Sequence, residues 1–130
     1  HLNIYKCRPD VMAIVHSHPV YASTFAVAGE AVDSAITGEA RYMLGEVGLV
    51  GYHLMGSVEL AEACAKVMAN SNSAIMAKHG AITVGKTLFE AFDRMEVLEN
   101  TALINYNLRT MGCNVRMTGA EITEIDNFGK

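Results

Sequence analysis

The sequence predicts an α/β or α+β domain in which helices pack against a sheet. Short apolar runs rich in β-branched residues alternate with longer segments of helical periodicity. Apolar residues make up 51% and charged residues 18% of the 130 residues, enough for a buried core. No repeat, low-complexity stretch or linker divides the chain, so residues 1–130 are predicted to form a single domain.

The first predicted elements are a helix end and a buried strand. Residues 2–8 match the end of a helix, which a turn at Arg8–Asp10 closes. The run Val11–His16 is continuously apolar with β-branched residues, which is typical of a strand covered on both faces.

A helix is predicted next, over Val20–Ala28. Pro19 suits its start and Gly29 its end. Frequent glycines then break the pattern, and we expect a short helix near 39–44 and a strand near 47–52.

The second half of the chain begins with a capped helix. Ser57 is a good N-cap followed by acidic residues, and Asn70–Asn72 ends this helix. Strands are predicted at Ser73–Ala77 and Ala81–Val84, on either side of Lys78–Gly80.

The longest helix is predicted over about Thr87–Thr110. One apolar face of it comprises Leu88, Ala91, Phe92, Met95, Leu98 and Ala102. Glu96 and Glu99 lie largely on the other side and are interpreted as a solvated acidic face. Thr118–Glu121 has capping-box spacing and predicts a last short helix.

Charge and composition exclude several classes of function. The net charge of −4 without a basic run argues against nucleic-acid binding, and no apolar run reaches the length of a membrane span. No signal peptide is visible, and Cys7, Cys64 and Cys113 fit the reduced thiols of a cytoplasmic protein, two of them filling the core. Because the chain begins inside a structured pattern at His1, we expect N-terminal sequence to be missing.

His16 and His18 are the first candidate metal ligands. They end a predicted strand, where residues i and i+2 point to one face with about 6–7 Å between their backbones. Two imidazoles at that spacing can converge on one ion, and Pro19 fixes the chain as it leaves the strand. His79 is the candidate third ligand, because it lies between two short strands and directly before Gly80, which permits an unusual backbone or a close approach.

Three histidines with an open fourth position form the pattern of a catalytic zinc site. An H-x-H pair alone is weak, and the alternative is two surface histidines and one hydrogen-bonded core histidine. His53 has no partner at ligand spacing and is interpreted as a loop residue. Tyr42 and Tyr52 would be proton donors if they reach the metal.

Three stretches of the chain resemble the class II aldolase/adducin family. The likeness runs over about residues 1–125 and its motifs are specific for the family, though not for one activity within it. The matching motifs are His1–Lys6, Arg8–Asp10 and Val15–Pro19; Gly56–Ala61; and Lys78–Gly80 with Gly85, Glu90–Ala91 and Glu96–Glu99.

The resemblance implies a three-layer α/β/α sandwich with a mostly antiparallel central sheet. It places the family's zinc-binding histidines on His16, His18 and His79. Zn²⁺ or another divalent metal would act as a Lewis acid and stabilise the enediolate that forms when a carbon–carbon bond of a sugar phosphate breaks. Family members assemble as ring-shaped homotetramers, with active sites completed by a neighbouring subunit.

The resemblance leaves the catalytic residues open. The family's general base, a glutamate, and its phosphate loops fall before His1. The catalytic tyrosine of the aldolases falls on Thr37, with Tyr42 five residues on. The position of the acidic base of the epimerases corresponds to Arg41, which argues against epimerase activity.

The sequence therefore predicts a metal-dependent aldolase acting on a sugar phosphate such as a ketose 1-phosphate. Epimerase, decarboxylase and dehydratase activities remain open within the same class. A non-catalytic, adducin-like interaction domain is the alternative of another class, and the intact set of three ligands favours the enzyme.

Overall fold

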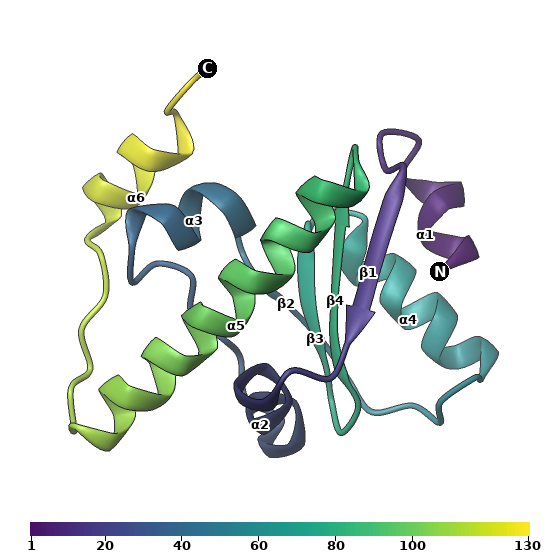
Figure 1. Cartoon of the computed structure of the whole chain (residues 1–130), viewed down its shortest axis with the longest axis horizontal. Coiled ribbons are helices and arrows are strands. Elements are labelled where there is room, and N and C mark those ends of the chain that lie inside the picture. Colours follow the sequence, from purple (N-terminus) through teal and green to yellow (C-terminus); the bar gives the residue numbers. More distant parts are fainter.

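A computed structural model describes all 130 residues of the chain (Figure 1). Its helices are α1 (Leu2–Cys7), α2 (Val20–Ala28), α3 (Gly38–Leu44), α4 (Val58–Met68), α5 (Leu88–Thr110) and α6 (Gly119–Asp126), and its strands are β1 (Ala13–Ser17), β2 (Gly48–Val50), β3 (Ser73–Met76) and β4 (Gly80–Gly85). None of the helices combines the length and the apolar character that crossing a membrane requires.

The four strands form one mixed sheet in the order β1-β4-β3-β2. β4 pairs antiparallel with both β1 and β3, whereas β2 joins β3 in parallel. The sheet is therefore mostly but not purely antiparallel. The parallel pair follows from the α4 crossover, because only a crossover connection can return the chain in the same direction.

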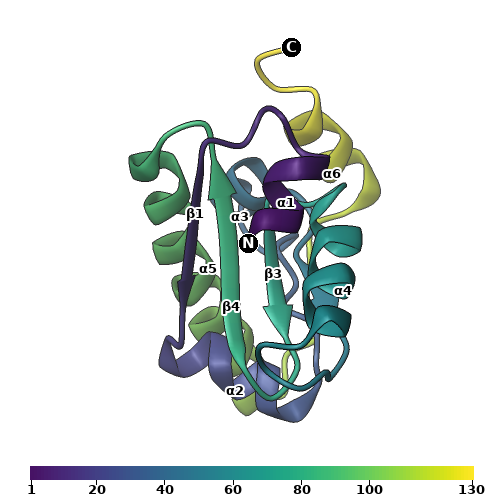
Figure 2. The same cartoon turned by 90° about the vertical axis from the view of Figure 1, so that its right-hand side faces the viewer.

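Helices cover both faces of the sheet, which confirms the three-layer arrangement (Figure 2). Alternate residues of the central strands divide between two cores, as the two-residue period of a strand requires. Ile75 and Ala81 pack with α2, α3 and α5, and Ala74, Met76 and Ile82 pack with α1 and α4. β3 and β4 are buried along their whole lengths, which accounts for their mostly apolar sequences.

Local capping sets most helix boundaries. Gly29 takes a left-handed conformation at the end of α2, and Ser57 accepts a hydrogen bond from the backbone N–H of Leu60 at the start of α4. Thr118 and Glu121 form the predicted capping box of α6. The predicted helix over Val20–Ala28 is confirmed at both of its ends.

Two predictions about burial were wrong. Leu88 and Phe92 of α5 are 67% and 50% exposed, although Ala91 between them is fully buried beside β4. The side of the helix that faces the sheet is therefore narrower than the predicted apolar face. Of the three free cysteines only Cys64 is buried, whereas Cys7 is exposed and Cys113 is half-buried. Cys7 is the last residue of α1, where its thiol lies toward the carbonyl oxygens of Ile4 and Ala65 rather than into the core.

Candidate metal centre

The end of β1 brings the first two candidate ligands close together. His16 pairs with Ile82 of β4, whose side chain belongs to the core under α1 and α4. His16 therefore faces the same side of the sheet. β1 ends at Ser17, so His18 lies just past the strand, directly before Pro19 at the N-cap of α2.

The imidazole of His16 has one defined tautomer. Its Nδ1 lies 2.9 Å from the carbonyl oxygen of Ala81. A carbonyl oxygen only accepts, so Nδ1 must carry the proton and Nε2 keeps its lone pair. Histidine ligands of metal ions commonly have this arrangement, in which a carbonyl orients the ring and raises its basicity.

His79 reaches the same place from the β3–β4 turn. The prediction that this turn needs a close approach at Gly80 is confirmed, because a Cβ there would lie 2.4 Å from Cδ2 of His18 and 2.6 Å from the carbonyl oxygen of Ser17. The unusual backbone belongs to Lys78 instead, whose φ of 56° is left-handed.

The three histidines gather at one point. The imidazole centroid of His16 lies 4.9 Å from those of His18 and His79, and the latter two are 5.4 Å apart. One ligand atom from each residue lies within 4.8 Å of the others, so the side chains form a possible metal site. Nitrogens bound to one tetrahedral zinc lie about 3.4 Å apart, so loading would draw the rings together.

Electrostatics favours the neutral form of the His16 imidazole. Burial lowers the pKa of His16, the hydrogen bond to the carbonyl of Ala81 opposes that shift, and the neighbouring His79 and His18 lower the pKa further. A neutral ring is the form that binds a metal ion, so the lowered pKa of His16 keeps its Nε2 available as a ligand.

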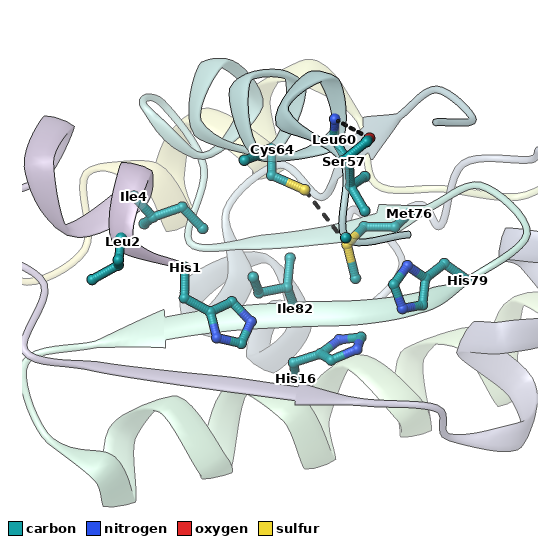
Figure 3. A pocket seen from close by; sticks show the side chains of 12 residues that line it. His1, Leu2, Ile4, His16, Ser57, Leu60, Cys64, Met76, His79 and Ile82 are labelled. Atoms are coloured by element: carbon teal, nitrogen blue, oxygen red, sulfur yellow. Dashed lines mark hydrogen bonds between the residues drawn. The ribbon is translucent and has the colours of Figure 1, made fainter. Parts of the chain in front are cut away.

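A cavity of about 370 Å³ opens beside His16 and His79. Figure 3 shows His1, His16 and His79 along one side of it and side chains of α4 opposite. Most of its wall is apolar, with Leu2, Ile4, Gly56, Ser57, Leu60, Ala61, Cys64, Met76 and Ile82 completing the lining. Such a pocket, apolar with a few convergent polar groups, has the character of a small-molecule site.

Several other candidate residues lie elsewhere. Tyr42 packs edge-on against Phe128 with ring centroids 5.5 Å apart, and neither Tyr42 nor Tyr52 lines the cavity. Thr37 caps α3, and Arg41 pairs with Asp126 at 2.7 Å. His53 lies in the loop after β2 and is not part of the cluster, as predicted.

The interpretation of Glu99 as part of a solvated acidic face was wrong. Its carboxylate accepts hydrogen bonds from the backbone N–H groups of Tyr21 and Ala22 in the first turn of α2. Sequence reasoning also missed the cavity, because its wall comes from helix positions whose apolar character equally fits a filled core.

Comparison with known proteins identifies the family. The sequence-family model for the class II aldolase and adducin N-terminal domain matches residues 1–106. The chain therefore belongs to the class II aldolase and adducin family. This places the three-histidine cluster in a family whose aldolases depend on a metal ion.

Relatives within this family carry different activities in their names. The chain is 40% identical to an L-fuculose phosphate aldolase of Methanococcus vannielii, over 82% of this chain and 57% of the relative. It is 30% identical to a 3-oxo-tetronate 4-phosphate decarboxylase of Haemophilus influenzae, over 100% of this chain and 63% of the relative. The chain thus spans about three fifths of the length of these relatives.

A solved structure supports the same fold. The crystal structure of YgbL from Escherichia coli superposes with a TM-score of 0.88 at 29% identity. The superposition covers 96% of this chain and 62% of YgbL.

Proposed function

We propose that the chain forms the metal-binding core of a class II aldolase, a lyase that cleaves a carbon–carbon bond of a sugar phosphate such as a ketose 1-phosphate. The observation that carries this proposal is the convergence of three imidazoles, one ligand atom of each within 4.8 Å of the others, beside a cavity large enough for a small ligand. The aldolase relative at 40% identity supports the reaction class.

His16, His18 and His79 would hold the ion, and zinc is the metal we propose. Three neutral imidazoles suit zinc and leave an open position, although cobalt, nickel and copper accept the same ligands. When bound, the ion would supply Lewis acidity toward a carbonyl and a neighbouring hydroxyl of the substrate. The chain's own contribution is to fix the tautomer of His16 through Ala81 and to shield the site with the apolar wall of the cavity.

Decarboxylation of a 3-oxo sugar-acid phosphate is the second candidate. The observation that favours it is the decarboxylase relative, whose likeness covers the whole of this chain. Both reactions leave negative charge on the carbon beside a carbonyl, so one Lewis-acid site would serve either. A homotetramer is also proposed from the family resemblance and is checked by light scattering.

Metal content tests the site directly. We expect about one zinc per chain by elemental mass spectrometry, and none in His16→Ala/His79→Ala. His18→Ala should also lose the metal while the fold remains, because His18 is exposed and contributes little to the core. His53→Ala is the matched control and should keep the ion.

Activity then separates the two candidates. An aldolase would release dihydroxyacetone phosphate from a ketose 1-phosphate, whereas a decarboxylase would release carbon dioxide from a 3-oxo acid phosphate. Absence of metal from both wild type and the double variant would contradict the proposal and favour the adducin-like interaction domain.

A further inference from the structure

Helix α2 touches both chain segments that carry the candidate ligands. Its N-cap, Pro19, directly follows His18. Near its other end, the carbonyl oxygen of Ala26 accepts a hydrogen bond of 2.8 Å from the backbone N–H of Lys78, the residue before His79. One helix of nine residues therefore spans the distance between the two segments.

The first turn of α2 has no capping side chain of its own. Pro19 offers no side-chain acceptor, and no acidic residue occupies the first turn. Glu99 of α5 supplies the acceptor from another helix. Its carboxylate oxygens lie 2.8 and 3.2 Å from the backbone nitrogen of Tyr21, and one of them lies 2.9 Å from that of Ala22. A carboxylate at a helix N-terminus also interacts favourably with the helix dipole.

Lys78 fixes the other end of α2. It is the only non-glycine residue with a positive φ, a conformation that side chains with a Cβ rarely adopt. In addition to the backbone hydrogen bond to Ala26, its Nζ lies 3.3 Å from the carbonyl oxygen of Val27. The left-handed residue that precedes His79 is thus attached to the last turn of α2.

We propose that α2 acts as a strut that sets the relative position of His18 and His79, with Glu99 and Lys78 as the positioning residues at its two ends. The inference rests on the proposed metal site. Only His16 is oriented by a hydrogen bond of its own ring, to Ala81. The positions of the other two imidazoles depend on where the backbone places them. Removing groups that position metal ligands typically changes metal affinity about 10–100-fold.

Variants of Glu99 test the N-terminal end of the strut. Two quantities are measured: the imidazole NMR resonances of His18 and His79 in metal-free protein, and the Kd of Co²⁺ from its visible absorption. Glu99→Ala should shift both imidazoles and raise the Kd about tenfold. Glu99→Gln keeps one acceptor oxygen and should restore both readouts. Glu96→Ala removes an exposed carboxylate of the same helix without a hydrogen bond to α2, and should change neither.

Variants of Lys78 test the other end. Glycine accepts a positive φ and keeps the backbone hydrogen bond, so Lys78→Gly should retain Co²⁺ affinity. Valine is β-branched and resists that conformation, so Lys78→Val should move the turn and weaken binding. If α2 acts as one body, Glu99→Ala combined with Lys78→Val should weaken binding by less than the product of the two single effects.

The outcomes separate the strut from the metal site itself. Unchanged imidazole resonances and Co²⁺ affinity in a folded Glu99→Ala variant would overturn the strut. Wild-type protein that binds no Co²⁺, while Glu99→Ala still shifts both imidazoles, would overturn the metal proposal and support the strut. If Glu99→Ala does not fold, the comparison of Lys78→Val with Lys78→Gly decides the question, and equal Co²⁺ affinities in that pair would overturn it.

Discussion

The two ends of the β1–β4 ladder carry polar clusters of opposite character. At the end where β4 begins, three imidazoles face one another. They cannot neutralise each other, and their charged forms repel, which contributes to the lowered pKa of His16.

At the other end, guanidinium and carboxylate groups satisfy one another. Arg8 donates to both carboxylate oxygens of Asp10 at 2.8 Å and to the carbonyl oxygen of Met68 at 2.8 Å. Arg94 pairs with Glu90 at 2.9 Å and donates hydrogen bonds to backbone carbonyls.

The difference shows how a stabilising polar cluster can be told from a candidate site. The charged groups of Arg8, Asp10, Glu90 and Arg94 find their partners inside the chain, so that cluster is complete without a ligand. The three histidines have no carboxylate among their ion-pair partners, so that cluster lacks charge partners within the chain and has the form of a candidate metal site.

Gly80→Ala should have the largest effect, which is a loss of metal affinity. The added methyl would lie 2.4 Å from the ring of His18 and 2.6 Å from the carbonyl oxygen of Ser17. The exposed ring of His18 can swing out, but the carbonyl oxygen of Ser17 belongs to the backbone, so the variant should also lose about 2 kcal/mol in the free energy of unfolding. We expect Co²⁺ affinity to fall about 100-fold, at the upper end for disturbed ligand supports. Wild-type affinity in this variant would argue that His18 is not a ligand.

Gly85→Ala, at the far end of β4, should lower stability without weakening metal binding. A Cβ there would lie 2.7 Å from the backbone nitrogen of Ala91 and 2.9 Å from the carbonyl oxygen of Thr87, atoms that cannot rotate away. We expect a loss of about 2 kcal/mol in the free energy of unfolding, measured with urea, as for other overpacked sites. Co²⁺ affinity of the folded protein should stay unchanged. A fall in affinity equal to that of Gly80→Ala would show that the two ends are not independent.

Local signals made much of the fold predictable. Pro19 and Gly29 bound α2, and Thr118 with Glu121 starts α6, because caps act within one turn of chain. The H-x-H spacing likewise anticipated that His16 and His18 meet. The strand contributes only His16, however, since β1 ends at Ser17, and the chain's path into α2 completes the approach.

Long-range features could not be predicted from the sequence. Glu99 caps a turn 78 residues earlier, and no spacing rule links the two positions. The parallel pairing of β2 depends on where α4 crosses the sheet, and the exposure of Phe92 depends on which side of α5 faces the sheet. His79 was a candidate third ligand from its place between two short strands and before Gly80, and the family resemblance placed the third zinc-binding histidine at the same residue.

Arg8→Met should destabilise the fold moderately and leave the histidine end intact. The change removes the donors to the carbonyl oxygens of Met68 and Ser71. Leaving such acceptors unpaired costs about 1 kcal/mol where water can still reach them. Chemical denaturation measures the loss. Arg8→Lys should recover little of it, because an ammonium cannot make the bidentate contact with Asp10. Reduced Co²⁺ affinity in either variant would contradict the separation of the two ends.

Acid should weaken the Arg8–Asp10 ion pair and metal binding by the histidines in different pH ranges. The change expected from removing the Asp10 carboxylate is the smallest of these effects. The hydrogen bonds from Arg8 hold the pKa of Asp10 at about 2, below its usual value of 3.8. Between these values the unfolded chain binds the proton and the folded chain does not. The stabilisation is therefore complete above about pH 4 and is lost as the pH falls toward 2.

Asp10→Asn should flatten the pH dependence of unfolding in that range, and only slightly, since the carboxylate is exposed. Release of Co²⁺ follows protonation of imidazoles at higher pH, so Asp10→Asn should leave its midpoint unmoved. A midpoint that shifts with Asp10 would mean that the charged network reaches the histidines through the ladder.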